Sequence, residues 1–406
     1  MEEIGHQYLA LALNIDRHFE GFVDAYFGPQ ELKAEVEAGE PPPLEALADD
    51  ARQLQSAIEQ SGYDPRRKDY LTRQTGAMAA VIRNLSGEQL DFVEEVELLF
   101  DVTPETVHEG AFEEVHAEMD RLLPGDGSLA ERVTAWEKGL ALERERILPV
   151  LDLARREARR RTLALFDLPP GEEVWLGLVE NQPWDAFNWY VGGYRSRIEL
   201  NIDHPVRADR ALGMMIHEAY AGHHTEGVIK EHRLYRQEGR AEHAVHLLLG
   251  PEAILAEGIA VSAQRLIFND EDLAAFLRQE LYPLAGLPEV DVEQPLGLAR
   301  ARDALRAVLG NAALLLHRDR RPPDEVQRYV ERYSLGTAEE AARTVRFIQI
   351  PLYRCYGFNY TAGKALLAPL LEGPDAVSNF RRLLSEPFTP TQIRGWVSER
   401  GASPPV

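Results

Sequence analysis

Cysteine is almost absent from this sequence, which has only one, Cys355, in 406 residues. A single cysteine excludes an internal disulfide and a zinc site built from cysteine thiolates. Long apolar runs are missing too. No window reaches the roughly 18 uncharged apolar residues that a membrane-spanning helix requires. The apolar run from Leu9 to Leu13, behind an acidic N-terminus, is too short for the core of a signal peptide. We therefore expect a cytoplasmic protein.

Positive charge is scarce. The chain has 44 Lys and Arg residues against 67 Asp and Glu residues, which gives a formal net charge of -23. Such a surface repels the phosphates of nucleic acids and the headgroups of anionic lipids. We therefore expect no nucleic acid and no membrane among its partners. A hydrophobic content of 45% and a charged content of 27% are those of a folded soluble protein.

The length and the breaks in the sequence pattern indicate how the chain is divided. At 406 residues it exceeds one compact core of ordinary size. Helical periodicity dominates the first 165 residues, and short Pro/Gly stretches interrupt it rather than long linkers. The helices that it predicts span residues 1–27, 43–62, 66–84, 87–99, 105–123 and 128–165. We expect a helical N-terminal part, 1–165, and a second part, 166–406, or one continuous domain around a cleft.

Between about residues 170 and 204 the pattern changes to that of β-strands. Glu173 to Val179 is rich in β-branched and aromatic residues, and Tyr194 to Ile202 alternates between apolar and polar side chains. Asn188 to Gly193, between them, is typical of a turn or of a stretch that another group approaches closely. Helical patterns resume at Pro205. The predicted fold class is mainly α with a small antiparallel β-sheet (α+β), in an elongated helical protein with a central cleft.

Three histidines and a glutamate fall within eight residues, His217-Glu218-Ala219-Tyr220-Ala221-Gly222-His223-His224. This composition is typical of a metal site with an adjacent general base. On a regular helix His217 and His223 do not share a face, and His224 lies about 10 Å further along the axis than His217. Gly222 is the residue that can unwind the helix and let His223 take the place of an i+4 histidine. We therefore predict a helix break at Gly222.

A catalytic zinc ion needs a third protein ligand and an open position for water. Glu257 is the downstream candidate, because apolar residues surround it in Ile254-Leu255-Ala256-Glu257-Gly258-Ile259-Ala260. A carboxylate in such a setting is costly to bury unless a cation or a hydrogen-bond network meets it. The sequence therefore predicts a metal centre of His217, His223 and Glu257.

These residues resemble those of the gluzincin zinc metallopeptidases. There a His-Glu pair on one helix supplies a ligand and the general base, a second His follows, and a Glu on a later helix completes the site. A closer resemblance is to a large, poorly characterised bacterial family of the same superfamily, with the motifs His-Glu-x-x-Pro-Gly-His-His, Glu-Gly-Trp-Ala and Tyr-x-x-Gly-Lys. This chain has His217-Glu218 with Gly222-His223-His224, Glu257-Gly258 with Ala260, and Tyr360-Thr361-Ala362-Gly363-Lys364. The resemblance covers about residues 190 to 370 and implies a gluzincin-like metal-bearing core.

The chain departs from the motifs of that family at three places. Ala221 stands where the family usually has Pro, Ile259 stands where it usually has Trp, and the spacing before Tyr360 is longer. The first departure leaves the following glycine alone to shape the helix break. The last leaves Tyr353 and Tyr356 open as alternatives to Tyr360.

The resemblance implies a zinc-dependent enzyme that hydrolyses peptide bonds, with one zinc ion per chain. The predicted ligands are His217, His223 and Glu257. Glu218 would accept the proton of the attacking water and later pass it to the leaving amine. Tyr360 would donate a hydrogen bond to the developing oxyanion. His224 is an alternative ligand to His223, or a residue that contacts the ligands or the substrate.

The expected substrate is a peptide or a small amide. In gluzincins an edge strand binds an extended peptide, and the strand Tyr194 to Ile202 occupies the corresponding place in this chain. Two alternatives stay open: a metal-dependent hydrolase of a non-peptide amide or ester, and a non-catalytic metal-binding descendant. An intact Glu218 argues against the descendant, because a structural metal site needs closed coordination and no base.

Other histidines and arginines are weaker candidates for function. His243 and His246 are spaced to bind a metal, but we expect them on an exposed face of a connecting helix. His108-Glu109 lacks the spacing and the Glu-Gly partner of the motif, and we expect it on the surface. Arg346 and Arg354 are candidates for binding a substrate carboxylate.

Overall fold

Helices dominate the structure, as the periodicity predicts. The computed structural model describes residues 2–182, 184–351 and 353–401 of the chain. Over this part of the chain, helices pack around one three-stranded sheet and one two-stranded sheet. The predicted fold class, mainly α with a small sheet, is therefore confirmed. Within the same residues, none of the helices combines the length and the hydropathy of a membrane span.

Eight helices with well-defined ends precede the three-stranded sheet. They are α1 (Glu3–Asp16), α2 (Gln30–Ala38), α3 (Leu44–Gln60), α4 (Pro65–Leu85), α5 (Phe92–Phe100), α6 (Glu109–Leu122), α7 (Leu129–Gly139) and α8 (Arg144–Leu163). The predicted helix 128–165 is thus two helices. Between them the Leu142 N–H donates to the carbonyl of Val206, so a contact with a distant segment interrupts the helix.

Helices again follow the sheet up to the end of the described chain. They are α9 (Ala208–Glu218), α10 (His223–Lys230), α11 (Pro251–Ile267), α12 (Asp270–Phe276), α13 (Tyr282–Ala285), α14 (Glu293–Asp303), α15 (Ala307–Ala313), α16 (Pro323–Ser334), α17 (Ala338–Gln349), α18 (Asn359–Leu367), α19 (Ala376–Ser385) and α20 (Pro390–Glu399).

The helix predicted over residues 1–27 ends early, at Asp16. The Asp16 carboxylate accepts hydrogen bonds from the backbone N–H groups of Gly21 at 3.1 Å and Val23 at 2.9 Å. Gly21 has a φ of +88°, so the chain can turn sharply there. Strand β1 (Val23–Tyr26) then pairs antiparallel with β5 (Val245–Leu247). A strand whose partner is so distant in sequence leaves no local signal.

His243 and His246 do not lie on an exposed helix face, so that prediction is wrong. His243 is buried in a short 3₁₀ helix, Ala241–Ala244, and its ring lies 5.0 Å from the ring of Tyr70. His246 lies in β5, where it pairs with Ala25 of β1. His243 therefore packs against α4 and His246 against β1, and both contact the first 165 residues.

The three-stranded sheet has the order β2-β4-β3. Its strands are β2 (Glu173–Val179), β3 (Ala186–Gly192) and β4 (Arg195–Asn201). β3 and β4 pair antiparallel, as predicted, whereas β2 runs parallel to β4, so this small sheet is mixed and not wholly antiparallel. Of the two alternatives for 188–193, the turn is wrong, because most of that segment is β3. The close approach is confirmed at Gly192, where a Cβ would lie 2.3 Å from Cβ of Phe27. The reversal needs only Gly192, Gly193 and Tyr194, which all have positive φ.

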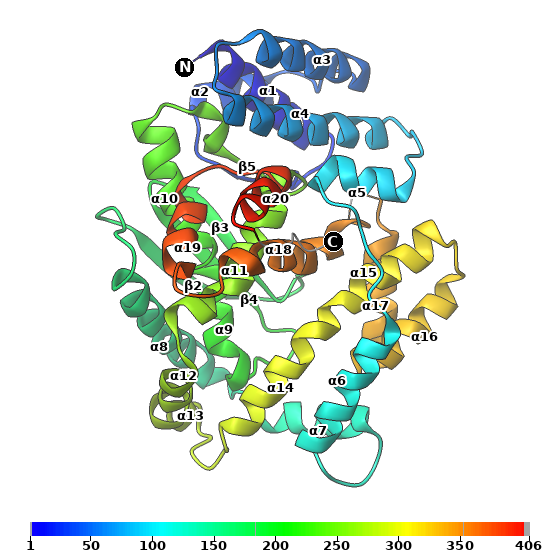
Figure 1. Ribbon diagram of the computed structural model, residues 1–406, viewed down its shortest axis with the longest axis vertical. Helices are drawn as coiled ribbons and strands as arrows, with labels where there is room; N and C mark the ends of the chain where they lie inside the picture. The colour runs from blue at the N-terminus through cyan, green and yellow to red at the C-terminus, as the bar shows by residue number, and fades with distance from the viewer. Residues whose placement is uncertain (1, 183, 352, 402–406) are drawn as a thin grey trace.

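Figure 1 shows how the layers are arranged. The blue helices α1, α3 and α4 form one end of the molecule, and α7 and α13 lie at the opposite end. One cluster of buried hydrophobic side chains extends from Tyr8 to Val397 and includes residues on both sides of position 165. Helices α4, α5 and α8 contact α11, so both predicted parts of the chain contribute to one core.

Helices α11 and α18 cross at a pair of glycines. A Cβ on Gly258 would lie 2.6 Å from the carbonyl carbon of Gly363, and a Cβ on Gly363 would lie 2.0 Å from the carbonyl oxygen of Ile254. Ordinary van der Waals contact of a Cβ begins at 3.4 Å. Only glycine therefore permits this approach of two helix backbones. The crossing brings the turn of α18 that carries Tyr360 close to Glu257 of α11.

Gly363→Ala is expected to destabilise the protein by roughly 2–3 kcal/mol, because the added methyl group must push two helix backbones apart. Gly76→Ala, in the middle of α4, is the matched control, since no described atom outside its chain neighbours and the backbone of its own helix lies within 4 Å of its Cβ position. It is expected to stabilise the protein by about 0.5–1 kcal/mol. Urea unfolding measures both changes, and equal effects would contradict a close glycine crossing.

Candidate metal centre

The chain leaves helical geometry between Glu218 and His223, as predicted. α9 ends at Glu218, α10 begins at His223, and the Tyr220–Ala221 peptide bond between them is cis. A Cβ on Gly222 would lie 1.9 Å from the carbonyl oxygen of His217. A residue with a side chain therefore does not fit at this position without moving the backbone. The predicted helix break at Gly222 is confirmed.

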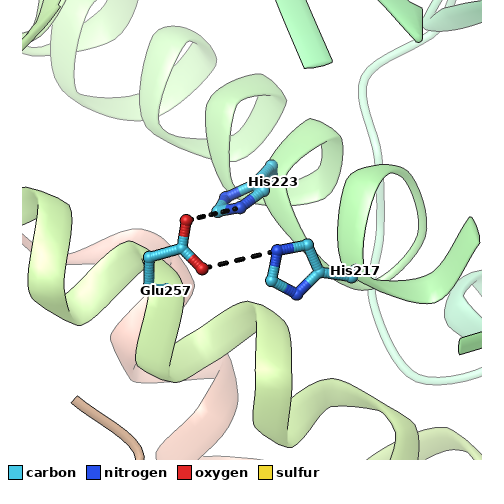
Figure 2. A group of neighbouring side chains, drawn as sticks. All are labelled: His217, His223 and Glu257. Atoms are coloured by element: carbon cyan, nitrogen blue, oxygen red, sulfur yellow. Dashed lines mark ion pairs between the residues drawn. The ribbon is translucent and has the colours of Figure 1, made fainter. Parts of the chain in front are cut away.

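The break brings His217 and His223 together, and both face Glu257 from α11, as Figure 2 shows. Nε2 of His217 lies 3.4 Å from Oε2 of Glu257, and Nε2 of His223 lies 3.6 Å from Oε1. The two imidazole rings have centroids 4.7 Å apart and are nearly perpendicular, at 88°. One donor atom from each residue lies within 4.8 Å of the other two. The three residues predicted as ligands therefore form one group.

The donor set fits a zinc ion. Two donor atoms bonded to zinc at about 2.0–2.1 Å and at a tetrahedral angle lie about 3.4 Å apart. The separations observed here are close to that value, at 3.4 Å from His217 to Oε2 and 3.6 Å from His223 to Oε1, the other oxygen of Glu257. Oε2 of Glu257 is buried and accepts no hydrogen bond from any described residue. Because an unpaired buried carboxylate oxygen is costly, this atom also favours a bound cation.

Burial and mutual charge set the protonation of the three residues. Burial lowers the pKa of His217 to about 4, which leaves its imidazole neutral near pH 7 with a lone pair for a metal. Burial also acts to lower the pKa of His223, but the carboxylate of Glu257 outweighs it and raises this pKa to about 9. Burial acts to raise the pKa of Glu257, but His217 and His223 together hold this pKa below its usual value. The His223 proton thus supplies positive charge that a metal ion would replace.

Glu218, the predicted general base, is the last residue of α9 and lies beside the group. Its Oε1 is 3.9 Å from Nε2 of His217. Burial raises the pKa of its carboxyl to about 7, which suits proton exchange near neutral pH. Its carbonyl oxygen accepts a hydrogen bond from the side-chain amide of Asn188 in β3. This bond attaches the end of α9 to the sheet.

Of the three candidate tyrosines, Tyr360 is the best placed. Burial raises the pKa of its hydroxyl, and the charges of the nearby Glu257 and Glu218 raise it further. The rings of Tyr356 and Tyr360 are in edge contact, with centroids 5.8 Å apart. The ring of Tyr353 instead stacks on another aromatic ring, that of the α17 residue Phe347, at 5.4 Å. The influence of both Glu257 and Glu218 on its hydroxyl favours Tyr360 over the other two tyrosines.

His224 is fully buried, and its hydrogen-bond partners lie outside the group of three candidate ligands. Its Nδ1 lies 2.9 Å from the hydroxyl of Ser196 in β4, and its Nε2 lies 3.0 Å from Oε2 of Glu172. Tyr220 donates a hydrogen bond to the same carboxylate oxygen, and Arg159 lies 2.6 Å from the other. The structure therefore does not bring His224 into the ligand group. It places this histidine in a polar network that holds the start of α10 against the sheet.

The strand beside the candidate centre is β3 rather than β4. β4 pairs with β2 on one side and with β3 on the other, so it is the central strand and has no free edge. The expectation that Tyr194 to Ile202 is an edge strand is wrong, because alternation along a strand does not reveal how many partners it has. β3 is an outer strand of this sheet, and its Asn188 contacts the end of α9.

Two charged residues near the centre were not predicted from the sequence. Asp24 in β1 lies close enough to His223 and Glu257 for their charges to shift its pKa. The charge of Arg306 acts on the pKa of both His217 and Glu257. Neither residue belongs to a motif, and single acidic or basic residues are common in this chain. Only the tertiary fold identifies them.

The weaker candidates lie outside the centre. Arg354 forms an ion pair with the fully buried Glu95 of α5, so its guanidinium is not available to a substrate carboxylate as proposed. Arg346 is exposed on α17. His108 precedes α6 as its N-cap, where its Nδ1 accepts a hydrogen bond from the backbone N–H of Gly110. This surface position of His108 agrees with the prediction.

Comparison with known proteins identifies a shared fold and no family. No family model and no curated protein sequence matches the chain. One similar solved structure is a candidate lipoprotein from Colwellia psychrerythraea, with a TM-score of 0.55 and 13% identity over 91% of this chain and 70% of that chain. Another is a candidate lipoprotein of unknown function from Shewanella oneidensis, with a TM-score of 0.53 and 12% identity over 90% of this chain and 76% of that chain. At such identities the likeness shows the fold alone.

Gly222→Ala is expected to destabilise the protein by about 3 kcal/mol or more, because its methyl group collides with a backbone carbonyl that cannot move freely. Gly213→Ala, in the preceding helix α9, is the matched control. The nearest atom to its Cβ position is a side-chain oxygen at 3.4 Å, so we expect a change within about 1 kcal/mol. Urea unfolding measures the change in the free energy of unfolding for both variants. If Gly222→Ala is as stable as Gly213→Ala, the steric account of the break is wrong.

Glu172 is expected to make stability depend on acid pH. Burial acts to raise its pKa, but hydrogen bonds from His224, Tyr220 and Arg159 outweigh it and lower the pKa from 4.5 to about 2. Because the folded pKa is the lower one, the ionised carboxylate stabilises the fold above about pH 4.5, and this contribution is lost as the pH falls toward 2. Between pH 6 and pH 3 the free energy of unfolding of the wild type should fall by about 2 kcal/mol more than that of Glu172→Gln. Denaturant unfolding at several pH values in this range measures both proteins. If the difference in free energy of unfolding between them stays constant, the pKa of Glu172 is not lowered in the folded state.

Proposed function

We propose that this protein is a zinc-dependent peptidase. The observation that supports the proposal most strongly is the group of His217, His223 and Glu257, whose donor atoms lie within 4.8 Å of one another next to Glu218. The three donors come from three helices and converge only because the chain breaks at Gly222. Two imidazoles and one carboxylate leave a fourth position for water, as a catalytic zinc site requires.

The side chains of this centre have complementary roles in the proposed reaction. Zinc bound by the three ligands would supply an acidified water, with a pKa of about 7, and a Lewis acid for the substrate carbonyl. Glu218 would accept a proton from the attacking water and donate it to the leaving nitrogen, and a pKa of about 7 suits both transfers. Tyr360, whose raised pKa keeps its hydroxyl protonated, would donate a hydrogen bond to the carbonyl oxygen as negative charge develops there.

The position of β3 favours a peptide over another amide as the substrate. In the described part of the chain no strand pairs with the outer edge of β3, and Asn188 on this strand contacts the end of α9. The backbone groups of an outer strand can bind an extended peptide by strand addition. The resemblance to gluzincins implies the same use of an edge strand, although here it is β3 that would serve.

Purified protein is expected to contain one zinc ion per chain. His217→Ala and Glu257→Ala should lose the stoichiometric zinc, because each removes one of three protein ligands. His6→Ala, at an exposed histidine of α1 outside the group, should retain it. Elemental analysis after dialysis against a weak chelator measures the content. Zinc at the same level in all four proteins would refute the proposed ligands.

Glu218→Gln is expected to retain zinc and to lose about 10²–10⁴-fold in kcat, since an amide cannot accept the proton. Glu271→Gln, at an exposed position of α12, should retain activity. Digestion of a peptide library, read by mass spectrometry, measures cleavage and shows from which end peptides are shortened. Full activity of Glu218→Gln would exclude its role as the base. No cleavage by zinc-loaded wild type would refute the peptidase proposal.

A further inference from the structure

Aromatic side chains gather on one face of the sheet formed by β2, β4 and β3. Trp175 of β2 and Trp189 of β3 flank Arg197 of β4 in one cross-strand row. The ring centroid of Trp189 lies 4.6 Å from that of Phe187, which lies 5.6 Å from that of Trp184, just before β3. All five side chains are exposed or half-buried. An aromatic row therefore follows β3 on the outer face of the sheet.

The two faces of β3 have different surroundings. The side chain of Asn188 lies on the inner face, where it donates to the carbonyl of Glu218 at the end of α9. Because successive side chains of a strand alternate between its faces, Phe187 and Trp189 lie on the outer face. There the indole N–H of Trp189 donates to a carboxylate oxygen of Glu199 at 2.8 Å. This hydrogen bond fixes the ring at the surface of the sheet.

The backbone of β3 alternates as well. The Asn201 N–H donates to the carbonyl of Asp185 at 2.9 Å, so in this antiparallel pair every second residue counted from Asp185 bonds to β4. Phe187 and Trp189 belong to this series, whereas the N–H and C=O of Asn188, between them, point to the outer edge. In the described part of the chain no other strand pairs with this edge. The backbone groups of Asn188 are therefore available to a ligand.

An extended peptide bound at this edge would have its own side chains on the same two faces. Directly opposite residues of neighbouring strands point the same way, with Cβ atoms about 4.5–5.5 Å apart. The peptide residue opposite Asn188 would point to the inner face, on the side of Glu218. Its two neighbours would lie on the outer face, beside Phe187 and Trp189. Cross-strand pairs with aromatic rings favour large apolar partners.

We propose that Phe187 and Trp189 select extended peptides that carry a large apolar side chain next to the residue facing the candidate centre. The preference would then recur at every second position of the peptide. The inference rests on the proposed function, because it assumes a peptide that adds to β3 with a carbonyl at the group of His217, His223 and Glu257. It adds a substrate class and the residues that recognise it.

Peptide hydroxamates test this proposal, because the hydroxamate group binds zinc and fixes the register of the peptide. The probes are acetyl-tetraalanine hydroxamate and four derivatives, each with phenylalanine at a different position. They are titrated calorimetrically into the zinc-loaded protein. In wild type, phenylalanine should tighten binding by about fivefold or more at one position or at two alternate positions, and by less than about twofold at the positions next to them.

The double variant Phe187→Ala, Trp189→Ala should reduce this gain to less than about twofold, whereas Trp189→Phe should retain most of it, because an aromatic ring remains. Trp175→Ala is the matched control and should keep the wild-type gain. Trp175 lies on the same face, but β4 and β3 separate it from the outer edge, so an added strand is roughly 14 Å away. Zinc content and thermal unfolding establish that the variants are loaded and folded.

Four results would overturn the assignment. The first is the absence of a position-specific gain in wild type, and the second is equal gains at neighbouring positions, which an extended strand does not give. The third is a gain that the double variant keeps. The fourth is a gain that Trp175→Ala also removes, which would assign the effect to the aromatic face as a whole.

The same titrations separate this inference from the proposed function. If none of the hydroxamates binds to wild type, the metal centre fails and the role of the two aromatic residues fails with it. If peptides are cleaved but phenylalanine gives no gain, only this inference is refuted. If the alternating gain depends on the two rings but no peptide is cleaved, β3 still binds extended peptides while the peptidase proposal is refuted.

Discussion

A buried carboxylate between two imidazoles is the constraint on which the rest of this centre depends. Glu257 lies on α11 among apolar side chains, and an ionised carboxylate is stable there only next to positive charge. The raised pKa of His223 and the lowered pKa of Glu257 express that requirement. A divalent cation would meet it more fully, because Oε2 of Glu257 has no hydrogen-bond donor among the described residues. The neutral His217 is already in the form that binds a metal.

Glycines make this arrangement sterically feasible. Gly222 lets the chain pass next to the carbonyl of His217, so that two histidines six positions apart can face one carboxylate. Gly258 and Gly363 let α11 and α18 cross at backbone contact, which brings Tyr360 close to Glu257. The glycines of the motifs are therefore explained by packing, whatever reaction the centre performs. The polar network around the buried His224 then holds the start of α10 against the sheet.

The sequence predicted those parts of the site that depend on local chain geometry. The mismatch between the spacing of His217 and His223 and the helical period required a break, and glycine is the residue that permits one. The parts that depend on distant pairing could not be predicted in this way. β1 was read as helix because its partner β5 follows far along the chain, and β4 was read as an edge strand because alternation shows burial rather than the number of partners. Asp24 was missed for the same reason, since its position results from that distant pairing.

The central claim is that His217, His223 and Glu257 together bind a zinc ion, and anomalous X-ray diffraction from crystals of the zinc-loaded protein tests it most directly. Data collected on both sides of the zinc absorption edge locate zinc independently of its neighbours. The account predicts one anomalous peak per chain, about 2.0–2.2 Å from Nε2 of each histidine and from a carboxylate oxygen of Glu257. A zinc-loaded crystal with no peak between these three side chains, or with the peak elsewhere, would contradict it.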